Sequence, residues 1–267
     1  MTINKEQIKR IVIKVGTNLL TSKDGNFDSQ KINLLARQII QILKMNKEVI
    51  IVSSGAIGLG KTKMNIKDKI NDIELKQASA AVGQSMLITE WNNVFAQENI
   101  ITAQALLSRT DITNKTTNKN ARNSLLKLLE LDIIPIINEN DVVSTEEIAN
   151  SVIGDNDNLS ALVSIMINAD LLIILTDQDG LYDQNPETNQ GAKLIKLVHE
   201  INEDIKSAAE NTMSQYGTGG MKTKVEAAEI ALKEKIHVVI ANGNKSDVLN
   251  KIINNEKIGT HFIPKDD

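Results

Sequence analysis

The segment RIVIKVGTN, residues 10–18, sets a pattern that the rest of the chain repeats. Its apolar residues follow one another without polar alternation, which is typical of a strand buried on both faces of a sheet. A lysine, Lys14, lies inside this apolar run, and Gly16 follows it. Glycine lets the backbone turn tightly and bring its N–H groups close to an anion. The segment therefore predicts a strand whose carboxyl end is suited to binding phosphate.

Short β-branched runs of the same kind recur along the chain and alternate with longer segments of helical periodicity. After the first run, for example, Ile32, Leu35 and Ile39 recur at the spacing that places side chains on one helix face. The other strand-like runs cover 48–53, 132–138, 170–176, 235–241 and 258–263, and the helical stripes cover 28–46, 74–90, 119–130, 157–168 and 223–234. Repeated strand–helix–strand units predict an α/β fold with a mainly parallel central sheet and helices on both faces.

The composition narrows the class of protein. A length of 267 residues suits one large α/β domain, so we expect a single domain over 1–267, divided near 168 only within one continuous sheet. The lack of cysteine, and of any apolar run of about 20 residues, favours a cytoplasmic protein without membrane spans. The net charge of −4 comes from mixed charges without a basic block, and only 2% of residues are aromatic, which argues against a nucleic-acid partner.

Ligands of open parallel sheets collect at the carboxyl ends of the strands, where loops lead into helix N-termini. The second strand ends in SSGAIGLG, residues 53–60, a small-residue turn that offers hydroxyl and N–H donors to an anion. It is neither a P-loop nor a dinucleotide fingerprint, and such a turn is also explained by backbone conformation alone. Lys14 has an equally plain alternative, because lysines snorkel from edge strands.

Two clusters of acidic and amide residues follow the strand at 132–138. The first reads NEND at 138–141, and the second reads GDNDN at 154–158 and opens an apolar helix. These side chains are suited to holding an ammonium group or orienting lysines, although a solvated loop is the alternative. The strand at 170–176 ends in TDQDGLY, residues 176–182, which suits a nucleotide's base or ribose but also an ordinary turn.

The segment GTGGMKTK, residues 217–224, gives the clearest local sign of an anion site. Its glycines run into a helix whose first turn carries Lys222 and Lys224. Positive side chains there oppose the helix dipole at a cost of a few tenths of a kcal/mol. An anion between them, such as a triphosphate, removes that conflict, so we expect a polyphosphate at this helix N-terminus.

Together these motifs resemble the glutamate 5-kinases of the amino acid kinase family. The matching stretches, in family order, are IKVGT at 13–17, VSSGA at 52–56, INEND at 137–141, GDNDN at 154–158, LTDQDGL at 175–181 and GTGGMKTK at 217–224. The resemblance spans essentially the whole chain. It implies a three-layer αβα sandwich around a mainly parallel sheet of about eight strands, with glutamate over 1–168 and ATP over 169–267.

The implied reaction transfers the γ-phosphoryl group of ATP to the side-chain carboxylate of L-glutamate, the first step of proline biosynthesis. A carboxylate is ionised at neutral pH, so no general base is needed and catalysis rests on alignment and charge neutralisation. The resemblance also implies Mg²⁺ carried mainly by the ATP phosphates, L-proline as a feedback inhibitor, and a homo-oligomer, either a dimer or a tetramer. Longer members carry a C-terminal PUA domain, so we expect this chain to be a short form.

The resemblance assigns a role to each matching position. Lys14 and Lys224 would flank the transferred phosphoryl group, with Asp157 holding both lysines in place. The glutamate-binding positions are Ser54, Asn138, Asp141 and Asn156, with Asp155 supporting their loop. The nucleotide-binding positions are Lys14, Gly16, Gly55, Thr176, Asp177, Thr218, Gly219, Gly220, Met221, Lys222, Thr223 and Lys224. Two departures from the family pattern concern loops: 147–153 looks longer than usual, and Lys222 replaces a residue that is often small and polar.

Other readings of the sequence compete with this one. Related kinases on the same scaffold phosphorylate N-acetylglutamate, aspartate, carbamate or a nucleoside monophosphate, and the two acidic and amide clusters favour glutamate among them. A non-catalytic anion sensor is expected to have lost a catalytic lysine, and a nicotinamide-dependent oxidoreductase to have a glycine fingerprint after the first strand. His199, His237 and His261 lack the spacing of metal ligands, so no protein metal site is expected. Trp91 is assigned to packing.

Overall fold

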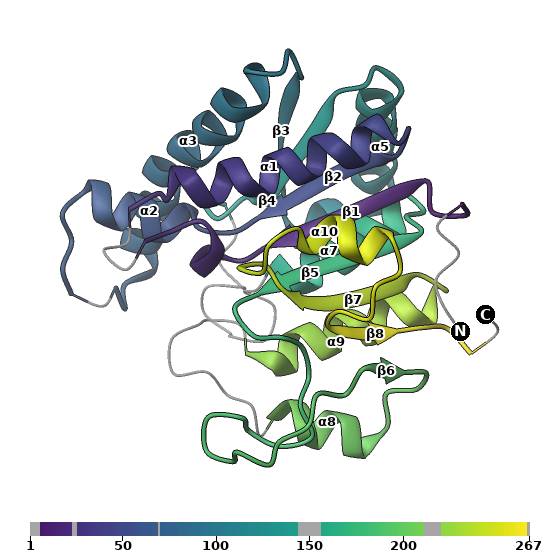
Figure 1. Cartoon of the computed structure of the whole chain (residues 1–267). Coiled ribbons are helices and arrows are strands. Elements are labelled where there is room, and N and C mark those ends of the chain that lie inside the picture. The colour runs from purple at the N-terminus through teal and green to yellow at the C-terminus, as the bar shows by residue number, and fades with distance from the viewer. Residues whose placement is uncertain (1–5, 23–25, 69, 144–155, 211–219, 266–267) are drawn as a thin grey trace.

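The computed structural model of the chain describes residues 6–22, 26–68, 70–143, 156–210 and 220–265 (Figure 1). These residues form an eight-stranded sheet with the strand order β3-β4-β2-β1-β5-β7-β8-β6. Every neighbouring pair is parallel except β7 and β8, which are antiparallel. The strands are β1 Arg10–Val15, β2 Glu48–Ser53, β3 Thr102–Leu107, β4 Ile134–Glu139, β5 Leu171–Thr176, β6 Leu197–Val198, β7 His237–Asn242 and β8 Thr260–Phe262.

Helices cover both faces of this sheet. They are η1 Thr17–Leu19, α1 Ser29–Lys44, α2 Ala56–Lys63, α3 Ile73–Ala96, α4 Arg109–Thr113, α5 Lys115–Glu130, α7 Asn156–Met166, α8 Glu203–Glu210, α9 Met221–Lys233 and α10 Val248–Ile253. Residues of α1, α3 and α10 form one apolar core with the sheet, and residues of α5, α7, α8 and α9 form a second core on the opposite face. None of the described helices is long and apolar enough to span a membrane.

The predicted α/β fold is confirmed, since the sheet is mainly parallel, has eight strands and lies between two helical layers. The runs at 10–15 and 48–53 coincide with β1 and β2, whose central residues are fully buried. Strand β3 was not predicted. It lies at the edge of the sheet with mostly half-exposed residues, so its sequence, TAQALL, lacks the continuous apolar run of a buried strand.

The central position of β1 brings together the turns that follow β1, β2 and β5. Val15 lies beside Ser53 of β2 on one side and beside Leu175 of β5 on the other. Because the three strands are parallel, their carboxyl ends lie at the same edge of the sheet. The residues that follow these strands are therefore neighbours in space, although they are far apart in sequence.

Helices α2 and α3 cross at very close range, and two glycines make this possible. A Cβ atom on Gly60 of α2 would overlap the carbonyl oxygen of Ser79, and one on Gly83 of α3 would overlap the carbonyl oxygen of Ala56. Each obstacle is backbone, so a flexible side chain cannot move aside to relieve it. The crossing fixes α3 directly against the first turn of α2, which follows the β2 turn.

We expect Gly83→Ala to destabilise the protein by about 3 kcal/mol, because the added methyl group forces the two helices apart. Gly58→Ala is the matched control, since a Cβ on Gly58 of α2 meets only Thr17 at 3.9 Å. Alanine also has the higher helix propensity, so the control should keep or slightly raise stability. Urea unfolding monitored by circular dichroism measures both changes, and equal stability of the two variants would contradict this account of the crossing.

Candidate functional site

Two lysines and one aspartate form a buried cluster beneath the carboxyl edge of the sheet. Lys14 Nζ lies 2.7 Å from Asp157 Oδ1, and Lys224 Nζ lies 3.1 Å from Asp157 Oδ2. Lys14 belongs to β1, while Asp157 and Lys224 lie in the first turns of α7 and α9. Along β1, Val12 packs into the core shared with α7 and α9. The alternation of a strand places Lys14 on the same face.

The cluster gathers two ammonium groups and a carboxylate almost completely shielded from water. The exposed fraction is 3% for Lys14, 0% for Asp157 and 6% for Lys224. Taking ions out of water costs several kcal/mol each unless their partners lie close by. An anion that approaches the lysines therefore gains more here than at a solvated surface.

The first turn of α9 reinforces the cluster. Thr223 Oγ1 donates to Asp157 Oδ2 at 2.9 Å, and Lys224 Nζ donates to the carbonyl oxygen of Gly220 at 3.3 Å. The Asp157 carboxylate is thus held by α9 through a hydroxyl as well as through an ammonium group. These bonds fix the orientation of the carboxylate and, through it, the positions of both lysines.

Glycine turns at the same edge leave room for an anion. Gly55 caps α2 with a φ of 116°, a left-handed conformation that favours glycine. A Cβ atom on Gly16 would come within 3.8 Å of Lys14 Nζ, and one on Gly220 would have no neighbour within 4 Å among the residues that the structure describes. Backbone N–H groups in the first turn of α9, which begins at Met221, are consequently approachable.

A chain of amide side chains lies beside these turns. Asn156 Nδ2 donates to Asn138 Oδ1 at 2.8 Å and to Ser54 Oγ at 3.0 Å. Asn138 Nδ2 in turn donates to Gln84 Oε1 of α3 at 2.6 Å. Three residues predicted to bind glutamate, namely Ser54, Asn138 and Asn156, are therefore brought together. Gln84 was not singled out from the sequence.

Asp141 follows β4 and lies near the end of the described stretch that closes at 143. Burial raises the pKa of its carboxyl group from 3.8 to about 6. A carboxylate in such a place is costly unless a cation accompanies it. Asp141 is thus electrostatically suited to an ammonium group.

The predicted nucleotide residues are placed less uniformly. Thr176 is buried at the end of β5, while Asp177 is exposed and accepts hydrogen bonds from Asn18 Nδ2 at 3.1 Å and from Thr176 Oγ1 at 3.2 Å. Lys222 is exposed and pairs with Glu210 of α8 at 2.8 Å. This contact raises the pKa of Lys222 through the hydrogen bond to Glu210. Lys222 therefore points to α8 and not to Asp157.

Asp155, Thr218 and Gly219, together with the 147–153 segment, lie outside the described residues. The hydrogen bond of Trp91 was not predicted from the sequence. Its ring stacks on Phe95, as packing predicts, but its Nε1 donates to Ser53 Oγ at 3.1 Å and so fixes the end of β2. An indole N–H beside a serine-rich strand end is a possible signal for such a bond, because buried indoles need an acceptor.

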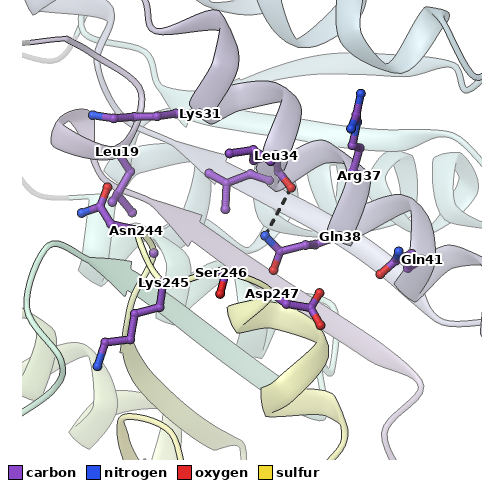
Figure 2. A pocket seen from close by; sticks show the side chains of 12 residues that line it. Leu19, Lys31, Leu34, Arg37, Gln38, Gln41, Asn244, Lys245, Ser246 and Asp247 are labelled. Carbon is purple, nitrogen blue, oxygen red and sulfur yellow. Dashed lines mark hydrogen bonds between the residues drawn. The ribbon is translucent and has the colours of Figure 1, made fainter.

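A pocket of about 450 Å³ lies on the other face of the sheet (Figure 2). It is bounded by α1 and by the turn between β7 and α10, and it is lined by Leu19, Lys31, Leu34, Leu35, Arg37, Gln38, Gln41, Gly243, Asn244, Lys245, Ser246 and Asp247. Two of its three cationic residues are engaged within the protein: Lys31 donates to the carbonyl oxygen of Thr21, and Lys245 pairs with Asp179 at 2.6 Å. The buried lysine cluster is chemically the better candidate for an active site.

Comparisons with known proteins agree with the fold and with the family that the sequence motifs resemble. The family model described as the amino acid kinase family matches residues 9–242. A glutamate 5-kinase from Clostridium perfringens is 47% identical over 258 residues, which are 96% of this chain and 96% of that protein. A longer glutamate 5-kinase from Dehalococcoides mccartyi is 44% identical over 262 residues, which are 98% of this chain and 70% of the relative.

Two solved structures share the fold at low sequence identity. Carbamate kinase from Giardia lamblia bound to AMP-PNP has a TM-score of 0.67 and 16% identity, with 97% of this chain and 99% of that chain covered. UMP kinase from Ureaplasma parvum has a TM-score of 0.63 and 18% identity, with 96% and 99% covered. The match of the family model over most of the chain, and two relatives above 40% identity that the chain covers to 70% and 96% of their lengths, show that the chain belongs to the amino acid kinase family.

Proposed function

We propose that the protein transfers the γ-phosphoryl group of ATP to the side-chain carboxylate of L-glutamate, forming L-glutamyl 5-phosphate for proline biosynthesis. The observation that carries this proposal is the Lys14–Asp157–Lys224 cluster, in which two buried lysines share one carboxylate at the carboxyl edge of the sheet. The glutamate 5-kinases that match nearly the whole chain supply the choice of acceptor.

The proposed chemistry requires alignment and charge more than proton transfer. One oxygen of the glutamate side-chain carboxylate attacks the γ-phosphorus, the bond from that phosphorus to the β-bridging oxygen breaks, and ADP leaves with the bonding electrons. Lys14 and Lys224 neutralise the negative charge of the transferred group, and Asp157 keeps them at a fixed separation. No base is needed, because the attacking carboxylate is already ionised at neutral pH.

We propose that the substrate lies over the 1–168 part of the single domain and the nucleotide over the 169–267 part. Asp141 would bind the ammonium group of glutamate, while Ser54, Asn138 and Asn156 would bind its carboxylates through hydroxyl and amide groups. Asp155, which lies outside the described residues, is proposed to support this loop. The shared position of these groups at the ends of β2, β4 and the start of α7 supports the division.

The nucleotide would lie between the β5 end and the first turn of α9. The proposed contacts are Gly16, Gly55, Thr176, Asp177 and the segment from Thr218 to Lys224. Within this segment Lys222 pairs with Glu210, so its side chain would lie at the edge of the nucleotide site. Mg²⁺ would be held mainly by the phosphate oxygens, where it supplies further charge neutralisation. Among the described residues, no three histidine or acidic side chains lie close enough together to hold a metal ion by themselves.

The location, the oligomeric state and the inhibition of the protein are also part of the proposal. We propose a cytoplasmic homo-oligomer, a dimer or a tetramer, that is inhibited by L-proline. Native mass spectrometry measures the oligomer, and proline titration of the rate measures the inhibition.

The decisive experiment measures glutamate-dependent ADP release with magnesium-ATP and traps the acyl phosphate with hydroxylamine. N-acetylglutamate and aspartate are tested in parallel at equal concentrations. We expect hydroxamate to form with glutamate at a rate at least about tenfold above either alternative, as loss of a matched polar contact predicts. Preference for another acceptor would overturn the proposed substrate, and no turnover with any acceptor would overturn the kinase proposal.

Removing one lysine and removing the aspartate should affect stability to different extents. Lys14→Ala leaves Asp157 paired with Lys224, so the variant should fold normally while kcat falls by at least about a hundredfold. Asp157→Ala leaves two buried lysines without a shared carboxylate and should destabilise the protein by roughly 3–5 kcal/mol. Denaturant unfolding and steady-state rates check both expectations. Lys127→Ala, which removes an exposed partner of Glu130, is the control that should change neither quantity.

Asp141 should make glutamate affinity and stability depend on pH in opposite directions. Its pKa is raised to about 6, so protonation below pH 6 removes the proposed ammonium partner and kcat/KM for glutamate should fall tenfold per pH unit. In the free protein the charged carboxylate is unfavourable. Stability therefore decreases as pH rises from about 4 to about 6, and the full cost is present above pH 6.

The variant Asp141→Asn separates these effects. At pH 8 it should be more stable than the parent protein by up to about 3 kcal/mol, and this advantage should vanish as the pH approaches 4. Its kcat/KM for glutamate should be low and should lack the titration near pH 6. Thermal melting at pH 8 and pH 4 tests the first expectation, and an unchanged melting temperature at pH 8 would show that the carboxylate is not desolvated.

A further inference from the structure

We propose that Gln84 of α3 is a positioning residue for the acceptor site, which acts by holding the side-chain amide of Asn138 in place. Gln84 Oε1 accepts a hydrogen bond of 2.6 Å from Asn138 Nδ2. This inference rests on the proposed function, because it assigns Gln84 to the site that would hold glutamate.

A backbone carbonyl beside Asn156 determines which way the side-chain amides of this hydrogen-bonded series face. Asn156 Nδ2 lies 3.3 Å from the carbonyl oxygen of Ser53, which can only accept a hydrogen bond. Asn156 must therefore present its N–H₂ group there, and the same group donates to Asn138 Oδ1 at 2.8 Å. Asn138 is left to donate through Nδ2, and the partner that meets this donor must be an acceptor.

Gln84 supplies that acceptor. The Ser53 carbonyl sets which way the Asn156 and Asn138 amides face, and the Gln84 oxygen accepts a hydrogen bond from the Asn138 N–H₂ group at the end of the series. Without the Gln84 oxygen, Asn138 loses the partner that holds its N–H₂ group in place. Asn138 is only 3% exposed, so water cannot freely replace the lost bond.

The backbone places Gln84 at this point with little freedom. Gly83, its neighbour in sequence, is the residue that lets α3 approach the Ala56 carbonyl of α2. Two turns further along α3, Trp91 donates to Ser53 Oγ at 3.1 Å. Helix α3 is thus anchored to the β2 turn on both sides of Gln84, and a helix held in this way presents the glutamine at a fixed distance from β4.

The test compares Gln84→Leu with Gln41→Leu. Gln41 of α1 also accepts a hydrogen bond from an asparagine amide, that of Asn250, but far from the proposed acceptor site. We expect Gln84→Leu to raise KM for glutamate roughly tenfold while KM for ATP changes less than about twofold, because an unpaired buried amide is costly and lies on the acceptor side. Gln41→Leu should leave both KM values unchanged.

A double-mutant cycle distinguishes positioning from direct contact with the substrate. If Gln84 acts through Asn138, its replacement should change kcat/KM for glutamate by less than about twofold in an Asn138→Ala background, measured from initial rates at low glutamate. A full additional tenfold loss in that background would overturn the positioning role in favour of direct binding. Thermal melting of each variant confirms that the comparison is made between folded proteins.

The outcomes also separate this inference from the proposed function. If the parent protein phosphorylates glutamate and Gln84→Leu keeps its KM for glutamate, the inference is wrong and the function stands. If the parent protein prefers another acceptor, the function is wrong, and the KM for that acceptor decides the role of Gln84. An equal rise of KM for ATP and for the acceptor would show a general structural defect and would also overturn the inference.

Discussion

The rest of the structure depends on one buried carboxylate that two lysines share. Asp157 binds Lys14 through one oxygen and Lys224 through the other, so a central strand, α7 and α9 meet at a single charged group. Such an arrangement is unfavourable unless its geometry is precise, because the cost of desolvating three ions is offset only at short distances. The fold meets this requirement because β1 lies in the middle of the sheet and because α7 and α9 pack on the same face.

The two halves of the proposed site achieve rigidity by different means. Around Asp157 the order comes from charge, with Thr223 adding a neutral hydrogen bond to the same carboxylate. On the acceptor side the order comes from neutral amides, where each donor fixes the orientation of the next acceptor. Charge suits the moving phosphoryl group, whose negative charge is large. Directional amides suit the acceptor, whose carboxylates must be distinguished by position.

Much of the fold and part of the site followed from the sequence. Unbroken apolar runs predicted β1 and β2, because a strand covered on both faces has no polar alternation. Strand β3 was missed because an edge strand is only partly buried. The lysines were predictable because charge inside an apolar run, or against a helix dipole, needs an explanation. Gln84 was not, because an ordinary helical glutamine gives no sign of its partner until Gly83 is seen to bring α3 against α2.

The buried charges of the free protein are opposite in sign to the groups of the proposed ligands that would lie beside them. The lysine cluster keeps two ammonium groups away from water, and Asp141 keeps a carboxylate where burial raises its pKa to about 6. A ligand of the opposite sign relieves part of each desolvation cost. A ligand with phosphate at one end of the site and an ammonium group at the other relieves both at once, and neither ATP nor glutamate alone has this combination. The full electrostatic gain is therefore available only when both substrates are bound, which is also the state in which phosphoryl transfer is possible.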